Sequence, residues 1–252
     1  GAALLEWLGF RGALAVLAGM LLAGLIVTAI LLPSGVGRMK ARPKFTQVFS
    51  QVPAVNWLAA ARFFLFGARD VWFVVGLPVY LYAVLGWDFT EVGAFLALWV
   101  IGYGFVQATA PRLVRRSHHG AGPGGGTARL WAFVLALVPA GIALALQQGW
   151  DASTVLITGL ALFGIAFAIN SAVHSYLILA YSDFDKVSMN VGFYYMANAG
   201  GRLAGTVLSG WAYQTQGLAG CLWWSAGFVL LAALLSLRLP EVPAGEVRSA
   251  GA

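Results

Sequence analysis

Long apolar stretches recur along the whole chain, and each is close to or above the roughly 20 residues with which an α-helix crosses a bilayer. We predict seven such spans, at residues 13–32, about 55–85, 92–110, 130–146, 155–181, 187–213 and 222–237. Because 60% of the residues are hydrophobic and only 10% are charged, a soluble domain of 252 residues would lack polar surface. The sequence therefore predicts an all-α, polytopic membrane protein whose solvent is a lipid bilayer.

Positive charges are distributed unevenly between the loops that join these spans. If successive loops lie on alternate sides of the membrane, one side receives eleven Lys and Arg residues and the other receives only Arg11. The eleven are Arg38, Lys40, Arg42, Lys44, Arg112, Arg115, Arg116, Arg129, Lys186, Arg238 and Arg248. Short cytoplasmic loops are enriched in Lys and Arg, so we predict a cytoplasmic C-terminus. The net charge of +6 then reflects topology, and we expect no nucleic-acid partner.

Two inner loops differ from the short links on the outer side. Residues 33–53 begin PSGVGRMKARPKF and are typical of a basic cytoplasmic linker between two helix bundles. Four apolar residues of this stretch follow a helical spacing and indicate either a short surface helix or a plain linker. They are Phe45, Val48, Phe49 and Val52. The second inner loop, 111–129, is rich in glycine, and we expect it to be flexible.

A long linker followed by six helices is the plan of one half of a major facilitator transporter, whose two halves face each other across a central cavity. We therefore assign 1–32 to the end of an N-terminal half with one transmembrane helix, and 33–53 to the linker. Residues 54–239 form the predicted C-terminal bundle, and 240–252 form a cytoplasmic tail. The opening Gly1 and the odd number of spans suggest a piece of a longer protein or a truncated gene product.

Three arginines, Arg62, Arg69 and Arg202, fall inside predicted spans. A cation at the centre of a bilayer costs at least about 2.5–3.5 kcal/mol, so each is expected to face a partner or a water-filled cavity. Arg62 and Arg69 are seven residues apart and share one helix face. Arg69 lies near the midpoint of its span, from which a side chain does not easily reach the membrane surface.

Two stripes run along the predicted span 187–213. The polar stripe consists of Tyr194, Asn198 and Arg202, and the neighbouring stripe of small residues consists of Ala197, Gly201, Gly205 and Ser209. Stripes of small residues let helices approach closely in a membrane, so we predict that the second stripe packs against another helix. The preceding span adds Asn170 and His174, one turn apart and flanked by Ser171 and Ser175.

Asp70 is the only carboxylate well inside a predicted span, and two roles are open to it. It either forms a structural ion pair with one of the three arginines, or tunes an arginine and exchanges a proton during transport. One carboxylate cannot neutralise three arginines. At least one cation is therefore left for an anion in the cavity, or for an acidic residue outside this chain. Guanidinium groups fit phosphate and carboxylate through paired hydrogen bonds.

Other chemistry is weakly indicated. Cys221 is the only cysteine, which excludes an internal disulfide and a site with several thiolate ligands. The adjacent His118 and His119 are typical of solvated loop residues, and His174 is more typical of a neutral helix residue than of a proton carrier. Ser171 with His174 is the only nucleophile–base pair, and no third carboxylate stands at helical spacing to orient it. We expect no enzyme, no metal and no cofactor.

Four long strings carry a family resemblance. They are ARFFLFGARDVWFVVGLPVYLY (61–82), LWVIGYGFVQATAPRL (98–113), INSAVHSYLILAYSDFDKV (169–187) and YYMANAGGRLAGTVLSGW (194–211). Together they resemble the C-terminal half of the ArsJ-type permeases, organoarsenical efflux members of the major facilitator superfamily. The resemblance implies export of 1-arseno-3-phosphoglycerate, the unstable ester made when arsenate replaces phosphate in the glyceraldehyde-3-phosphate dehydrogenase reaction. It also implies a missing N-terminal transporter half as partner.

The sequence thus predicts the C-terminal bundle of an anion exporter in a bacterial inner membrane. The predicted substrate-binding residues are the cations Arg62, Arg69 and Arg202 with the neutral groups of Tyr194, Asn198, Asn170 and His174. The hard oxygens of phosphate and arsenate suit arginine, whereas trivalent arsenic prefers thiolates. The alternatives are an exporter of another organic anion and a drug–proton antiporter.

Overall fold

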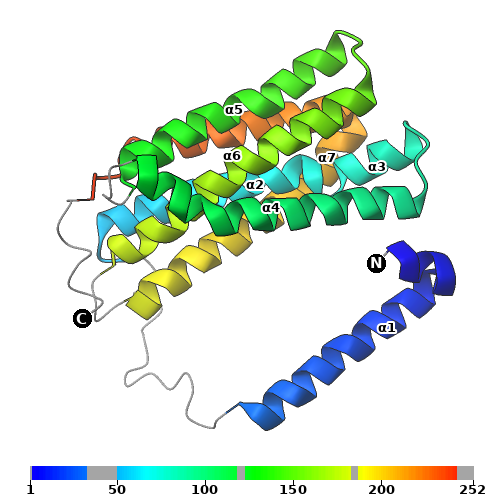
Figure 1. The fold of residues 1–252 in the computed structure, drawn as a ribbon, viewed down its shortest axis with the longest axis horizontal. Helices are drawn as coiled ribbons and strands as arrows, with labels where there is room; N and C mark the ends of the chain where they lie inside the picture. Colours follow the sequence, from blue (N-terminus) through cyan, green and yellow to red (C-terminus); the bar gives the residue numbers. More distant parts are fainter. Residues whose placement is uncertain (1, 33–49, 118–122, 183–186, 243–252) are drawn as a thin grey trace.

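A computed structural model describes residues 2–32, 50–117, 123–182 and 187–242, and these ranges are helical, with no strand (Figure 1). The helices are α1 (Ala2–Leu31), α2 (Pro53–Phe73), α3 (Gly76–Ala83), α4 (Phe89–Ser117), α5 (Gly125–Gln147), α6 (Ala152–Ala180) and α7 (Val187–Ser236). The all-α prediction is confirmed. Within the described ranges, six helices are long and apolar enough to cross a membrane, with α2 and α3 counted as one.

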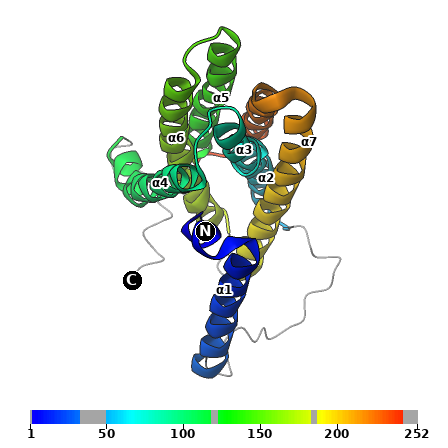
Figure 2. The same ribbon diagram turned by 90° about the vertical axis from the view of Figure 1, so that its right-hand side faces the viewer.

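Helix α7 explains why seven spans were predicted where six long helices are found. Its 50 residues would extend about 75 Å at 1.5 Å per residue, more than twice the thickness of a hydrocarbon core. Gly217 interrupts it with φ 68° and ψ −167°, a conformation that glycine adopts without a Cβ clash. The two arms, 187–216 and 218–236, fold back on each other, so that both ends of α7 lie at the same end of the bundle (Figures 1 and 2). The outer link predicted at 214–220 is thus a turn at one residue.

The predicted span 55–85 is broken between α2 and α3, at Val74 and Val75. Pro78 accounts for the break, because it has no N–H to donate to the carbonyl of residue 74 and its ring clashes with that carbonyl. The backbone N–H of Gly76, left without a partner in its own helix, donates to the Ser209 hydroxyl at 3.1 Å. A side chain of α7 therefore stabilises the break.

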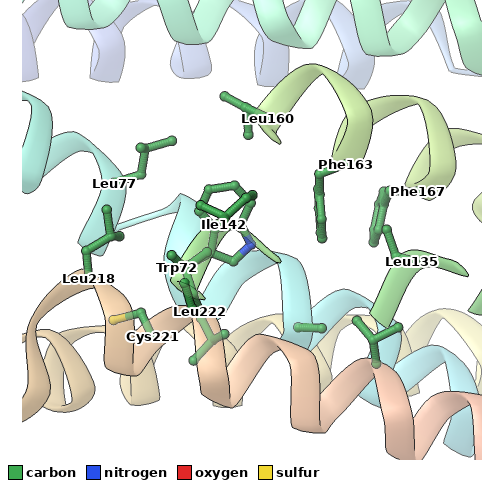
Figure 3. Close-up of a cluster of buried hydrophobic side chains, with 14 of the residues drawn as sticks. Trp72, Leu77, Leu135, Ile142, Leu160, Phe163, Phe167, Leu218, Cys221 and Leu222 are labelled. Atoms are coloured by element: carbon green, nitrogen blue, oxygen red, sulfur yellow. The ribbon is translucent and has the colours of Figure 1, made fainter. Parts of the chain in front are cut away.

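A buried aromatic and aliphatic core joins α2, α3, α5, α6 and α7 (Figure 3). Phe163 and Phe167 stack on α6 with ring centroids 5.5 Å apart, and Trp72 of α2 meets Phe163 edge-on at 5.2 Å. Cys221 is buried in the same cluster. Because these side chains interlock, α2 is fixed along α6 and along the second arm of α7.

Helix α1 lies apart from the bundle and touches it along α4, where the Thr90 hydroxyl donates to the Glu6 carboxylate (Figure 1). Its side chains are exposed, except for the buried Ala13 and a few partly covered neighbours. Most of the predicted linker, including the apolar residues at positions 45, 48 and 49, lies outside the described residues.

The glycine-rich stretch has a packing role at the start of α5, where flexibility was expected. The chain that follows α7 lies directly on these glycines: the N–H of Gly126 donates to the Glu241 carboxylate at 2.7 Å, and that of Gly125 to the Pro240 carbonyl at 3.2 Å. A Cβ atom at Gly125 would lie 2.4 Å from the carbonyl oxygen of Leu239, so no larger residue fits. The described start of the predicted tail is thus part of the bundle.

This contact also involves the end of α6. The hydroxyl of Tyr181, the residue after α6, donates to the Pro240 carbonyl at 2.5 Å. Burial raises the pKa of Tyr181, and the nearby Glu241 carboxylate raises it further. Residues from α5, α6 and the end of α7 are therefore held together at the end of the bundle where α2 begins.

Candidate anion-binding site

The polar residues predicted inside the membrane gather at two levels between α2, α6 and the first arm of α7. Measured from the starts of α2 and α7 at 1.5 Å per residue, Arg62 and Tyr194 lie about 10–14 Å along, whereas Arg69 and Arg202 lie about 22–24 Å along. We call the nearer level the Arg62 cluster: Arg62, Asn170, Ser171, His174 and Tyr194. We call the farther level the Asp70 bridge: Arg69, Asp70 and Arg202.

Glycines let α2 and α7 approach closely enough to form both levels, and these two helices make the most extensive helix–helix contact of the described chain. A Cβ atom at Gly201 would lie 2.0 Å from the carbonyl oxygen of Phe63, and one at Gly205 would lie 2.4 Å from that of Gly67. Ser209, farther along the same stripe, supports the break between α2 and α3, whereas Ala197 is only partly buried. The stripe of small residues therefore lies where α7 meets α2.

The Asp70 bridge joins these helices through a single carboxylate. Asp70 is 1% exposed; its Oδ1 accepts a hydrogen bond from Arg69 Nε at 2.6 Å, and its Oδ2 accepts one from Arg202 Nε at 2.9 Å. The side chain of Arg69 is 15% exposed, and that of Arg202 is 54% exposed. Asp70 is thus an ion-pair partner of two arginines at once. One positive charge remains on the three groups.

Arg62 is enclosed without a carboxylate. It is 4% exposed, and its Nη1 donates to the Ser171 hydroxyl at 3.1 Å and to the Ser171 carbonyl at 3.3 Å. Its guanidinium lies 3.9 Å from the ring centroid of Phe66 and 5.0 Å from that of Tyr194. Among the described residues it forms no salt bridge. Aromatic faces and neutral oxygens hold this cation, and its charge is not neutralised.

Several polar atoms of the Arg62 cluster are buried without a partner in the described chain. They are Nε of Arg62 itself, both amide atoms of Asn170 and both ring nitrogens of His174. Buried polar groups almost always have a hydrogen-bond partner, and leaving one unpaired costs about 1–3 kcal/mol. Since the cluster combines an unmatched cation with free donors, its composition suits an anion or water.

The structure brings most of the predicted site residues together, at the two levels rather than in one pocket. Arg62, Asn170, His174 and Tyr194 belong to one level, and Arg69, Asp70 and Arg202 to the other. Asn198 lies between them on α7, partly buried, and its amide oxygen has no partner in the described chain.

Two contacts of the arginines were not predicted. The sequence indicates Ser171 only as a flanking residue or as a nucleophile beside His174, but its hydroxyl accepts a hydrogen bond from Arg62. Phe66 lies within 3.9 Å of Arg62 and 5.1 Å of Arg69, measured from each guanidinium to the ring centroid. The spacing of Phe66, four residues after Arg62 and three before Arg69, is the signal that indicates this contact in the sequence.

The chain matches no protein-family model and no curated protein. The likeness to ArsJ-type permeases therefore stays a prediction. What supports a function is the arrangement of the buried charges.

Proposed function

We propose that this chain is the C-terminal bundle of a secondary transporter that exports a small organic anion. One observation carries the proposal: three arginines lie at two levels along α2, α6 and α7, well inside the length of these apolar helices, and the described residues supply one carboxylate for them. A polar membrane residue without a structural partner is most often functional, because an uncompensated charge in the bilayer is costly. An oxyanion arriving at these arginines would compensate the excess charge.

The donors favour a multivalent oxyanion over a soft or neutral ligand. In the Asp70 bridge, only the Nε atoms of Arg69 and Arg202 are used by the carboxylate. The terminal nitrogens of the half-exposed Arg202 are suited to a second acceptor such as phosphate. Cys221 is buried in the apolar core beside Ser209 and belongs to neither level of the site, which argues against a thiolate path for trivalent arsenic.

We further propose that the substrate is 1-arseno-3-phosphoglycerate and that its export confers arsenate resistance. The resemblance of four long strings to ArsJ-type permeases supports this choice, and the preference of arginine for phosphate and arsenate oxygens agrees with it. The excess of Lys and Arg in alternate loops supports a C-terminus in the cytoplasm, and the resemblance to ArsJ-type permeases supports a bacterial inner membrane. An N-terminal half would then face the two levels and close the cavity.

The test is transport by the full-length gene product in inverted membrane vesicles. We expect uptake of 3-phosphoglycerate or of freshly formed arsenylated ester. In Arg62→Gln we expect uptake to fall at least about 100-fold, because this variant removes a buried positive charge that no described carboxylate neutralises. Arg11→Gln, which changes an exposed arginine of α1, is the matched control and should retain uptake. Undiminished uptake in Arg62→Gln at equal membrane levels would contradict the proposal, and preferred uptake of an unrelated anion would change the substrate.

A further inference from the structure

The Asp70 bridge places an internal carboxylate where a transported anion would bind. Both of its oxygens are engaged, one with each guanidinium, at 2.6 Å and 2.9 Å. A phosphate or carboxylate ligand would approach the same two arginines with the same kind of oxygen. We propose that Asp70 is a built-in substitute for the anion, which holds Arg202 in the empty site and which the substrate must displace from Arg202. This inference rests on the proposed function and adds to it that Asp70 sets the affinity of the site for the anion.

Arg202, rather than Arg69, is the partner that can be exchanged. Arg69 and Asp70 are neighbours on α2 and stay together however the helices move. Arg202 reaches Asp70 from α7, and more than half of its side chain is exposed, whereas Arg69 is mostly covered. A ligand therefore meets Arg202 first and can take over that guanidinium while Asp70 keeps Arg69.

The charges explain what such an exchange would achieve. While Asp70 holds Arg202, the two arginines and the carboxylate carry one positive charge. When the anion binds, Asp70 remains next to it, and the repulsion between the two negative groups weakens binding in a medium of low dielectric constant. When the anion leaves, Asp70 can take Arg202 back, so that the cation is never left without a partner. An exporter benefits from both effects, because a substrate held too tightly is not released.

The competing explanation is that Asp70 has a purely structural role, and it predicts a different result. If Asp70 only ties α2 to α7, its removal loosens the helices and leaves anion affinity equal or lower. If Asp70 competes with the anion, its removal frees two guanidinium edges and tightens binding. Asp70→Asn has nearly the same shape as the original side chain and removes the charge, so affinity in this variant separates the two explanations.

The experiment is calorimetric titration of the purified full-length protein with 3-phosphoglycerate and with inorganic phosphate. We expect Asp70→Asn to bind both anions at least about tenfold more tightly than the unmodified protein. In this variant the anion gains its hydrogen bond to the charged Arg202 without competition from a carboxylate. Asp88→Asn, an exposed aspartate that precedes α4, is the control and should not change affinity. Equal or weaker binding by Asp70→Asn overturns this inference alone. No binding by either protein overturns the proposed function as well.

A second measurement does not depend on the folding of that variant. The ¹⁵N resonance of the Arg202 Nε–H, identified by its loss in Arg202→Lys, reports directly on the bond to Asp70. We expect saturating 3-phosphoglycerate to shift this resonance in the unmodified protein and to shift that of Arg69 less. An Arg202 resonance that stays in place at saturation would show that Asp70 is not displaced, and would overturn the inference.

Discussion

The Arg62 cluster and the Asp70 bridge lie between the same helices, about 10 Å apart along α2. Their arginines nevertheless differ in both exposure and charge partners. In the bridge, Arg202 is half exposed and shares a carboxylate with Arg69. In the cluster, Arg62 is enclosed and meets a serine and two aromatic rings. A buried charge needs an opposite charge more than an exposed one does. Here the half-exposed arginine has the carboxylate and the enclosed arginine has none in the described chain, which is the reverse of what is expected.

This reversal indicates which level depends on a ligand. The bridge satisfies the described acidic group and would persist in an empty protein. The cluster keeps an unmatched cation and unpaired amide and imidazole atoms in the described chain, so it gains most from an anion or from water. We infer that the cluster, rather than the bridge, is the level that depends on a ligand.

The largest expected effect comes from separating the helices that form both levels. Gly201→Ala places a methyl group 2.0 Å from the Phe63 carbonyl oxygen, so α2 and α7 must move apart. We expect a loss of about 2–3 kcal/mol in the free energy of unfolding, as for overpacked cores. The measurement is unfolding of the purified protein in detergent.

Gly192 offers the matched control on the same helix. A Cβ atom at Gly192 meets nothing within 4 Å, and alanine is the better helix former there, so Gly192→Ala should raise stability by about 0.5–1 kcal/mol. The two variants should therefore differ in sign. A similar response of both would mean that α7 does not contact α2 through its small-residue stripe.

An intermediate effect is expected from exchanging arginine for methionine at each level. Arg62→Met removes an unmatched buried charge, and the Ser171 carbonyl still accepts from the Ser175 hydroxyl at 2.9 Å. We therefore expect Arg62→Met to raise the free energy of unfolding by about 1–3 kcal/mol while abolishing anion uptake. Arg202→Met should change stability by less than about 1 kcal/mol, because the Arg202 side chain is half exposed and the buried Asp70 keeps its ion pair with Arg69.

Unfolding and uptake are measured on the same preparations of these two variants. A lower stability of Arg62→Met would show that the guanidinium is a structural element of the bundle, fully compensated by its neighbours. In that case the contrast between the two levels would no longer indicate where the anion binds.

The hydropathy of the sequence was sufficient for the membrane-spanning segments and their order, but not for the break between α2 and α3. Residues that shape single helices were visible too: Pro78 stands at the break between α2 and α3, and Gly217 stands within the predicted link between the arms of α7. The role of the glycines at the start of α5 was missed, because it depends on residues 239–241, more than 100 positions away. Local sequence shows that a glycine is present but not which backbone lies on it.

The partners of the arginines could not be predicted from the sequence, for the same reason. In the sequence, Asp70 has three possible partners, and the choice of Arg69 and Arg202 depends on the depth at which α7 packs on α2. Arg62 donates a hydrogen bond to Ser171, which lies 109 positions away in the chain. The periodicity of a single helix cannot reveal such a contact. The small-residue stripe indicated that α7 packs closely, and only the structure identifies α2 as the helix it meets.

The smallest expected effect concerns an aspartate outside the membrane, which serves as a reference for Asp70. Asp151 precedes α6, and its carboxylate accepts a hydrogen bond from the Thr154 backbone N–H at 2.8 Å. That bond lowers the pKa of Asp151 below its ordinary value. Its contribution to stability is therefore complete above the ordinary aspartate pKa of about 4 and is lost as the pH falls through the lowered value. In Asp151→Asn, which keeps an acceptor but has no charge, unfolding measured between about pH 6 and pH 2 should depend less steeply on pH. An unchanged slope would mean that the charge of this cap contributes nothing, and Asp151 would then be no reference for a stabilising carboxylate.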